Sequence, residues 1–344
     1  MNLNRYLALA LALCFSAPAY SADETILPKQ KQENSKAPSL RVKTIAIAPQ
    51  PPRQPLEPSL ANDPNAPFAA YQRGNYLEAL QLAEMRAAKN NDVRAMTLLG
   101  ELYAEGLGVA PDPKKSLDWY QRAANAGDIQ ATFALGMLHL QGAGVPRSKD
   151  EAAKLFRRAA DKGNPHAAYN LALLYLEGQV FPQNFAEAAK LMRLAAEKDI
   201  PDAQHALAIF HQEGKGVSKD LAESVKWLRR AARLDHVPAT IELAIALFNG
   251  NGVEKDEVNA ALAMRRAALK GNPVAQNRLA RMLNAGRGVE KNVPEAMAWH
   301  LMARLQDISD PMLDGVFGSL SEEEKKRAEA ILKAWLRSKA PPNT

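Results

Sequence analysis

The sequence predicts an all-α fold, a right-handed α-solenoid of stacked helix hairpins that repeats every 36 residues. The first observation is compositional: 47% of the 344 residues are hydrophobic but only 6% are aromatic, so alanine, leucine and valine supply most of the apolar surface. Alanine and leucine favour helices. The second observation is that LGELYAEGLGV (99–109) nearly recurs as LGMLHLQGAGV (135–145). The third is that glycine, leucine and alanine each recur six times at this spacing: Gly106, Gly142, Gly178, Gly214, Gly250 and Gly286; Leu99, Leu135, Leu171, Leu207, Leu243 and Leu279; Ala95, Ala131, Ala167, Ala203, Ala239 and Ala275.

Each copy contains two predicted helices. In the first copy Ala95, Leu99, Leu102 and Tyr103 share one side of a helix that ends at Gly106. The second helix begins after a good N-cap residue in every copy: Asp112, Ser148, Asn184, Asp220, Asp256 and Asn292. A glutamate three residues later predicts a capping box in four copies: Glu151, Glu187, Glu223 and Glu295. One hairpin cannot bury its apolar face alone, but stacked hairpins share a continuous core.

The chain divides into five predicted segments. Residues 1–21 have the positive start, short apolar stretch and small residues of a secretory signal peptide, with cleavage after Ala19 or Ser21. Residues 22–67 hold nine of the 22 prolines and are expected to form a disordered tether or a docking ligand. A partial repeat (68–91), six full repeats (92–306) and a C-terminal helical cap (307–344) follow. Ser321 and Glu324 predict a further capping box in the cap.

The pattern A-x-x-x-L-G-x-x-Y-x-x-G-x-G-V, followed by an N-cap, W-Y and A-A-x-x-G, resembles Sel1-like repeats, which are relatives of tetratricopeptide repeats. The resemblance covers about residues 68–306 and implies an adaptor for protein partners. With its signal peptide, the layout is similar to that of a periplasmic exopolysaccharide regulator that restrains a sensor kinase. A second branch of the family, cysteine-rich and associated with β-lactam binding or hydrolysis, has paired cysteines that are absent here. The third copy departs from the pattern at Val180 and Phe181.

Enzyme and cofactor signatures are not found in the sequence. There is no S-x-x-K, G-x-S-x-G or phosphate-binding G-x-x-x-x-G-K-[ST] motif. The six histidines form no i, i+4 pair of the helical zinc-site type, and the only cysteine, Cys14, lies in the predicted signal peptide. We therefore expect no catalytic residues, no metal and no cofactor. The formal net charge of +6 is mild for this length and there is no basic run, so nucleic acid is not an expected partner.

The candidate binding surface lies on the first helices, opposite the Ala95/Leu99 side. Successive copies place apolar side chains there, whereas the end copies place polar ones. The candidate partner-binding residues are Phe133, Met137, Leu140, Tyr169, Leu173, Leu176, Ile209, Ile241, Ile245 and Phe248. They form either a groove for an amphipathic helix or extended segment, or the packing between neighbouring first helices of a tightly curved solenoid.

These observations predict a scaffold or regulatory adaptor that is secreted across the inner membrane and acts in the periplasm. Its expected partner is a protein or peptide, such as an envelope sensor or assembly component, and no transmembrane segment is expected in the mature chain. The alternative is a cell-wall or β-lactam-handling hydrolase of the Sel1-like repeat type.

Overall fold

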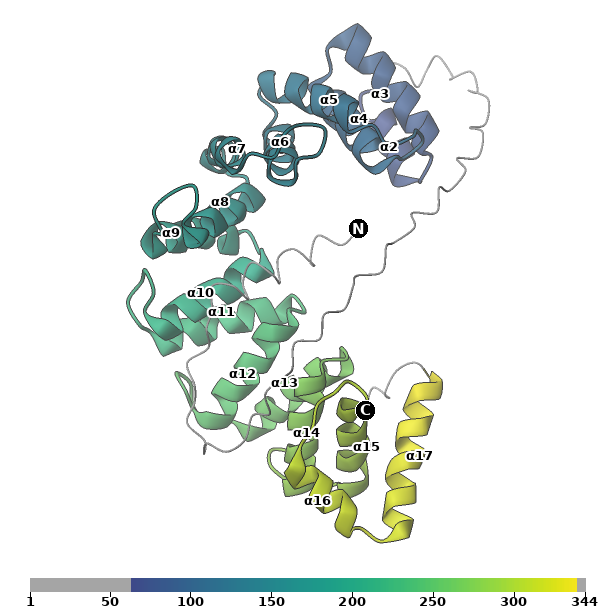
Figure 1. Cartoon of the computed structure of the whole chain (residues 1–344), viewed down its shortest axis with the longest axis vertical. Coiled ribbons are helices and arrows are strands. Elements are labelled where there is room, and N and C mark those ends of the chain that lie inside the picture. The colour runs from purple at the N-terminus through teal and green to yellow at the C-terminus, as the bar shows by residue number, and fades with distance from the viewer. Residues whose placement is uncertain (1–62, 339–344) are drawn as a thin grey trace, which may run out of the picture. The chain divides into compact units, whose positions relative to one another are not determined.

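The computed structural model describes residues 63–338, which form sixteen helices and contain no strand (Figure 1). The helices follow one another as antiparallel hairpins along the chain, so the predicted all-helical α-solenoid is confirmed. The predicted signal peptide, most of the proline-rich segment and the last six residues of the cap lie outside the described residues. The chain comprises two compact units, with the division after Ala159.

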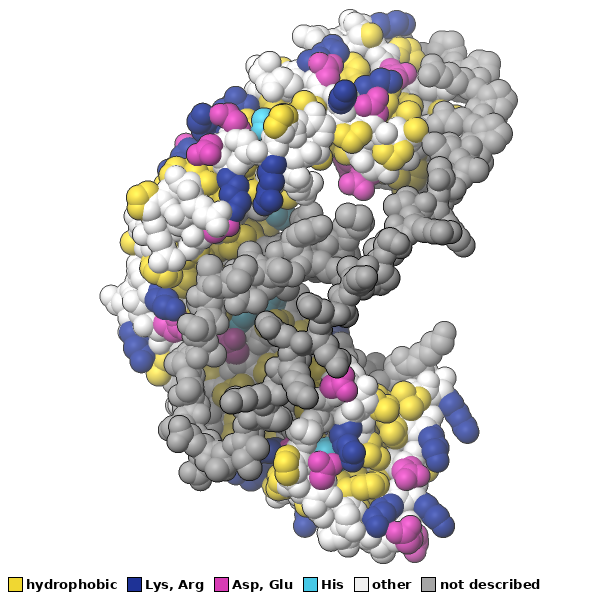
Figure 2. All heavy atoms as spheres, in the orientation of Figure 1, with side chains coloured by type: hydrophobic (Ala, Val, Ile, Leu, Met, Phe, Trp, Pro, Cys, Tyr) yellow, Lys and Arg dark blue, Asp and Glu magenta, His cyan; other side chains and the backbone are white. Residues whose placement is uncertain are grey.

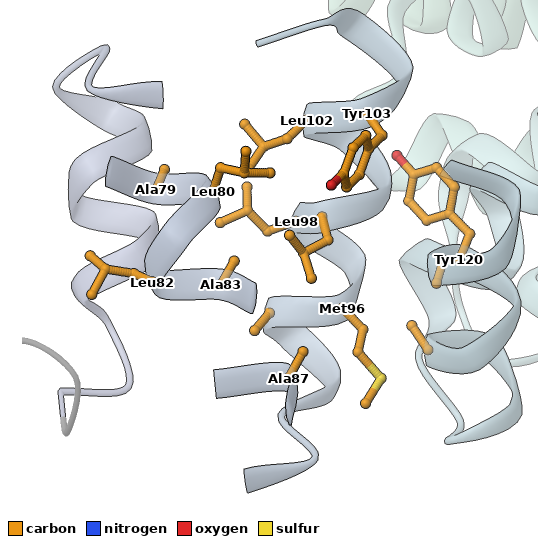
Figure 3. Close-up of a cluster of buried hydrophobic side chains, with 14 of the residues drawn as sticks. Ala79, Leu80, Leu82, Ala83, Ala87, Met96, Leu98, Leu102, Tyr103 and Tyr120 are labelled. Atoms are coloured by element: carbon orange, nitrogen blue, oxygen red, sulfur yellow. The ribbon is translucent and has the colours of Figure 1, made fainter. Parts of the chain in front are cut away.

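The first unit contains six helices: α2 (Ala66–Gln72), α3 (Tyr76–Asn90), α4 (Val93–Glu105), α5 (Pro113–Asn125), α6 (Ile129–Gln141) and α7 (Lys149–Asp161), whose last two residues belong to the second unit. The segment predicted as a partial repeat (68–91) therefore holds most of a short helix, α2, followed by α3. In the core of the first unit, leucines and alanines of α3 pack against those of α4. Tyr103 and Tyr120 extend this core toward α5 (Figure 3). The alternation of leucine with alanine lets the helix axes approach closely while the space between them stays filled.

The second unit contains the remaining ten helices: α8 (Pro165–Glu177), α9 (Phe185–Glu197), α10 (Pro201–Glu213), α11 (Leu221–Arg233), α12 (Val237–Asn249), α13 (Glu257–Leu269), α14 (Pro273–Ala285), α15 (Val293–Arg304), α16 (Pro311–Ser319) and α17 (Glu322–Ser338). Even-numbered helices from α8 to α14 are the first helices of hairpins, and the odd-numbered helix that follows is the second. Every first helix from α4 to α14 ends at a glycine with positive φ, such as Gly214 at φ 75°. Glycine reaches this conformation without the steric cost of a side chain.

The predicted N-caps of the second helices are all confirmed, but the predicted capping boxes are only half formed. Asp220 Oδ1, for example, accepts a hydrogen bond from the Glu223 N–H at 2.9 Å. The Glu223 carboxylate does not return to the backbone of Asp220, because that N–H donates to the His211 carbonyl oxygen at 2.8 Å. Glu223 pairs with Lys226 instead. A bond from the N-cap back to the last turn of the first helix therefore fixes each hairpin turn.

Five of the six loops have a second glycine, and close packing requires it. A Cβ on Gly108 would lie 2.5 Å from the backbone carbonyl carbon of Tyr76, at the start of α3. A Cβ on Gly252 would lie 2.3 Å from the backbone carbonyl oxygen of Leu221, at the start of α11. Each of these loops thus rests on the first turn of the second helix of the preceding hairpin. In the third copy, where Val180 and Phe181 depart from the pattern, the Phe181 ring stacks on Tyr175 with centroids 4.6 Å apart.

The C-terminal helices cover the last hairpin of the second unit. Trp335 of α17 packs against Trp299 of α15, with ring centroids 4.5 Å apart, and both side chains are buried. The capping box predicted at the start of α17 is confirmed: Glu324 Oε2 accepts from the Ser321 N–H at 3.0 Å, and Ser321 Oγ accepts from the Glu324 N–H at 3.3 Å. Here the N-cap N–H is not taken by a preceding helix, so the reciprocal bond forms.

Candidate protein-binding surface

The ten residues predicted to bind a partner lie on four first helices, α6, α8, α10 and α12. The structure buries two of them, Tyr169 and Leu176, each with only 4% of its surface exposed. The other eight are half-buried: Phe133, Met137, Leu140, Leu173, Ile209, Ile241, Ile245 and Phe248. None of the ten is fully exposed. A half-buried apolar side chain still presents area whose removal from water would favour binding.

Three of the half-buried residues occupy the same place in consecutive first helices of the second unit. Leu173 of α8, Ile209 of α10 and Ile245 of α12 are separated by 36 residues each, and we call them the apolar row. Met137 holds the equivalent position on α6 in the first unit. Equivalent positions of stacked repeats face the same side of the stack. One apolar residue in each first helix is therefore enough to build a line of apolar side chains.

Two other predicted residues are engaged by neighbouring side chains. The Phe133 ring lies against the buried Phe156 ring of α7, with centroids 5.7 Å apart. The Arg287 guanidinium lies over the Phe248 ring at 4.4 Å from its centroid. Phe133 therefore packs against its own hairpin, and the face of Phe248 is covered by a cation. A partner would reach the apolar row more readily than these two rings.

Charged residues hold the position of the apolar row in the first and last repeats. In the first, Glu101 accepts a hydrogen bond from the Tyr71 hydroxyl of α2 at 2.6 Å, and this bond raises the pKa of Tyr71 to about 12. In the last, the Arg281 Nε donates to Asp310, the N-cap of α16, at 2.6 Å. A hydrogen-bonded charged residue thus precedes the apolar position in the first unit and follows the apolar row in the second.

A set of ionisable side chains next to the apolar row was not predicted from the sequence. His205 Nε2 of α10 lies 2.9 Å from Glu242 Oε1 of α12, and His236 Nε2 lies 3.4 Å from Asp202 Oδ1. The two imidazole rings are 4.8 Å apart between centroids. His205 and Glu242 are 37 residues apart, one repeat plus one residue. The repeat period could have revealed this pairing, whereas a search for local histidine motifs could not.

The arrangement offers no metal centre and no membrane span within the part of the chain that is described. Residues 63–338 contain no group of three or more His, Cys, Asp or Glu side chains placed to hold a metal ion. None of the sixteen helices is both long and apolar enough to cross a bilayer. On the face shown in Figure 2, Lys and Arg side chains alternate with Asp and Glu rather than forming the continuous basic stripe typical of nucleic-acid binding.

Comparison with known proteins identifies the repeat. The family model described as Sel1 repeat matches six consecutive segments: 93–128, 129–164, 165–200, 201–236, 237–272 and 273–307. No curated protein matches the chain.

The chain is similar to several solved structures. A Sel1 repeat protein from Oxalobacter formigenes is 31% identical, with a TM-score of 0.63, over 71% of this chain and 100% of that one. The protective antigen c5321 of uropathogenic Escherichia coli, described as displaying an SLR fold, is 25% identical with a TM-score of 0.49, over 81% of this chain and 70% of that one. An immunity protein, Pa5087 from Pseudomonas aeruginosa, is 18% identical with a TM-score of 0.39, over 62% and 83% of the two chains.

Proposed function

Because this chain belongs to the Sel1 repeat family, we propose that it is a scaffold or regulatory adaptor that binds a protein or peptide along the first helices of its repeats. Sel1 repeat scaffolds generally mediate protein–protein interaction. The observation that carries the proposal is the apolar row, because Leu173, Ile209 and Ile245 are half-buried at the same position of three consecutive helices. A bound helix or extended segment would remove their remaining apolar surface from water, at about 25 cal/mol per Å² before ordering costs.

We also propose that the protein acts in the periplasm, on an envelope sensor or an assembly component. The support is the sequence of residues 1–21, with Arg5 before a short apolar stretch and small residues ahead of two cleavage positions. Release of the protein by osmotic shock, with a mature N-terminus after Ala19 or Ser21, is the expected result. Retention of residues 1–21 on a protein found only in the cytoplasm would contradict this location. The hydrolase alternative gains no support from the family or from the related structures.

The binding proposal is tested by crosslinking in the intact cell envelope, followed by identification of the captured protein. We expect Leu173→Asp and Ile209→Asp to reduce capture of that protein by about ten-fold or more, because a carboxylate in the row would have to be desolvated on binding. The matched control is Leu262→Asp on α13, where the leucine is 59% exposed on a second helix. Helicity by circular dichroism verifies that all three variants fold. Equal capture by the row variants and the control would remove the apolar row as the binding surface.

A further inference from the structure

The first and second helices of the second unit differ in charge. The first helices α8, α10 and α12 contain four carboxylates, Glu177, Asp202, Glu213 and Glu242, and no lysine or arginine. The second helices α9, α11 and α13 contain eight lysines and arginines and four glutamates. Glu213 is balanced by Lys215 in the next loop, with Nζ and Oε2 2.6 Å apart. The helices that carry the apolar row are therefore acidic, although the whole chain has a net positive charge.

Two of these carboxylates, Asp202 and Glu242, stand beside the row, and within residues 63–338 their only ionic partners are histidines. The His236 Nδ1 accepts the Ala239 N–H at 3.1 Å, so its proton lies on Nε2, which faces Asp202. Asp202 therefore accepts a hydrogen bond from this imidazole, and no lysine or arginine among the described residues forms an ion pair with it. The hydrogen bond from His236 holds the pKa of Asp202 below its ordinary value, against the effect of burial, so Asp202 is ionised at neutral pH.

Glu242 also lacks a lysine or arginine partner among the described residues. One of its oxygens, Oε1, meets His205, while Oε2 is buried without a hydrogen-bond partner among the described residues. The buried Tyr169 hydroxyl of α8 likewise has no partner there, and burial and then the charge of Asp202 raise its pKa. The Glu242 and Asp202 side chains keep 35% and 41% of their surface exposed. A cation placed at this surface would meet two partly buried negative charges in surroundings of reduced dielectric.

We propose that the partner of this surface is a protein segment that carries lysine or arginine beside apolar side chains, with the apolar groups on the row of Leu173, Ile209 and Ile245 and the cations on Asp202 and Glu242. This inference rests on the proposed function and specifies the chemistry of the partner. Charge complementarity selects a basic segment over an acidic or neutral one, because an acidic segment would bring like charges together on α10 and α12.

The test is a selection of peptides from a random 12-residue display library. The target is the purified protein with the N-terminus that it has when recovered from cells. We expect the selected sequences to be enriched in lysine or arginine next to leucine, isoleucine, valine or phenylalanine. A synthetic peptide of the selected consensus should lose affinity by about five-fold or more on the double substitution Asp202→Asn and Glu242→Gln. Its affinity should also fall as sodium chloride rises from about 50 mM to about 500 mM, because salt screens exposed charges. The double variant Glu197→Gln and Glu254→Gln, at exposed carboxylates outside the first helices, is the matched control.

Several outcomes would overturn this inference. Enrichment of acidic or neutral sequences, no enrichment, or equal loss of affinity in the two double variants would each exclude a basic partner. Selected peptides that match the chain's own basic stretch within residues 36–53 would assign the surface to that segment instead. A dimer in sedimentation velocity that the Asp202/Glu242 variant dissociates would assign it to a second copy. The envelope crosslinking with Leu173→Asp is independent of these charges, so a failed inference leaves the proposed function separately testable.

Discussion

Asp310 and Arg281 join the last repeat to the cap through a hydrogen bond of 2.6 Å from Arg281 Nε to Asp310 Oδ2. The Asp310 side chain is buried, whereas half of the Arg281 side chain remains exposed. Asp310 also caps α16, because its Oδ1 accepts the Met312 and Leu313 N–H groups, and Asn277 Nδ2 donates to its Oδ2 at 2.9 Å. One carboxylate therefore both starts a helix and fastens it to α14.

Replacing Asp310 with alanine should destabilise the second unit. The substitution removes an N-cap and leaves Arg281 and Asn277 without their acceptor, which predicts a loss of about 1–3 kcal/mol in the free energy of unfolding. Chemical denaturation followed by circular dichroism measures the change. Asp161→Ala removes an exposed carboxylate of the same unit and should change stability by less than about 0.5 kcal/mol. Identical midpoints for the two variants would argue against the role given to Asp310.

The contribution of Asp310 should depend on pH. Burial alone raises its pKa, but hydrogen bonds from Arg281 and Asn277 outweigh burial and lower the pKa from 3.8 to about 2. Because the folded pKa is the lower one, the stabilisation is fully present above the unfolded value near 4 and is lost as the pH falls through about 2. The stability difference between the wild type and Asp310→Asn should therefore be constant above about pH 5 and shrink between about pH 4 and pH 2. Denaturation curves of both proteins across this range provide the measurement, and a difference that grows on acidification would contradict the sign.

Gly136→Ala should destabilise the first unit even though alanine is the better helix former. A Cβ at Gly136 would lie 2.5 Å from the Phe156 ring, which is fully buried and cannot move aside easily. Overpacking of this kind costs about 1–3 kcal/mol, more than the gain of about 1 kcal/mol in helix propensity.

The control for this substitution is Gly315→Ala in α16. Apart from its chain neighbours and the adjacent backbone of its own helix, nothing lies within 4 Å of a Cβ at this position, so only the helix propensity should change. We expect Gly315→Ala to raise the unfolding free energy by up to about 1 kcal/mol and Gly136→Ala to lower it, both measured by thermal and chemical denaturation. Stabilisation by both substitutions would show that the helix of Gly136 can shift away from Phe156.

Trp335→Ala should detach α17 from the last repeat. Trp335 is 6% exposed and packs on Trp299, so truncation leaves a cavity and costs up to about 3–5 kcal/mol of local stability. Hydrogen exchange of α15 and α17 amides should accelerate together. Leu336→Ala, next to it but 53% exposed, should leave exchange nearly unchanged. Equal effects of the two variants would mean that α17 is not held by the tryptophan pair.

Much of the fold could be predicted because its determinants are local and repeated. The six N-caps of the second helices and the terminal glycines of the first helices act within a few residues, and repetition made each one visible several times. For Glu151, Glu223 and Glu295 the prediction of a reciprocal capping box was wrong in one of its two hydrogen bonds. The N-cap N–H donates instead to a carbonyl oxygen of the preceding helix. Such competition depends on how two helices meet, which no local motif records.

The sequence by itself determined the helical class, the 36-residue period and the face of each first helix on which the apolar row lies, since these follow from the spacing of side chains along one chain. Only the tertiary structure decided that Tyr169 and Leu176 are buried while Leu173, Ile209 and Ile245 keep exposed surface. It alone brought His205 to Glu242 and Asp310 to Arg281. The physical reason is that burial and ionic pairing depend on distances between different helices, and those distances are set by the packing of the repeats against one another.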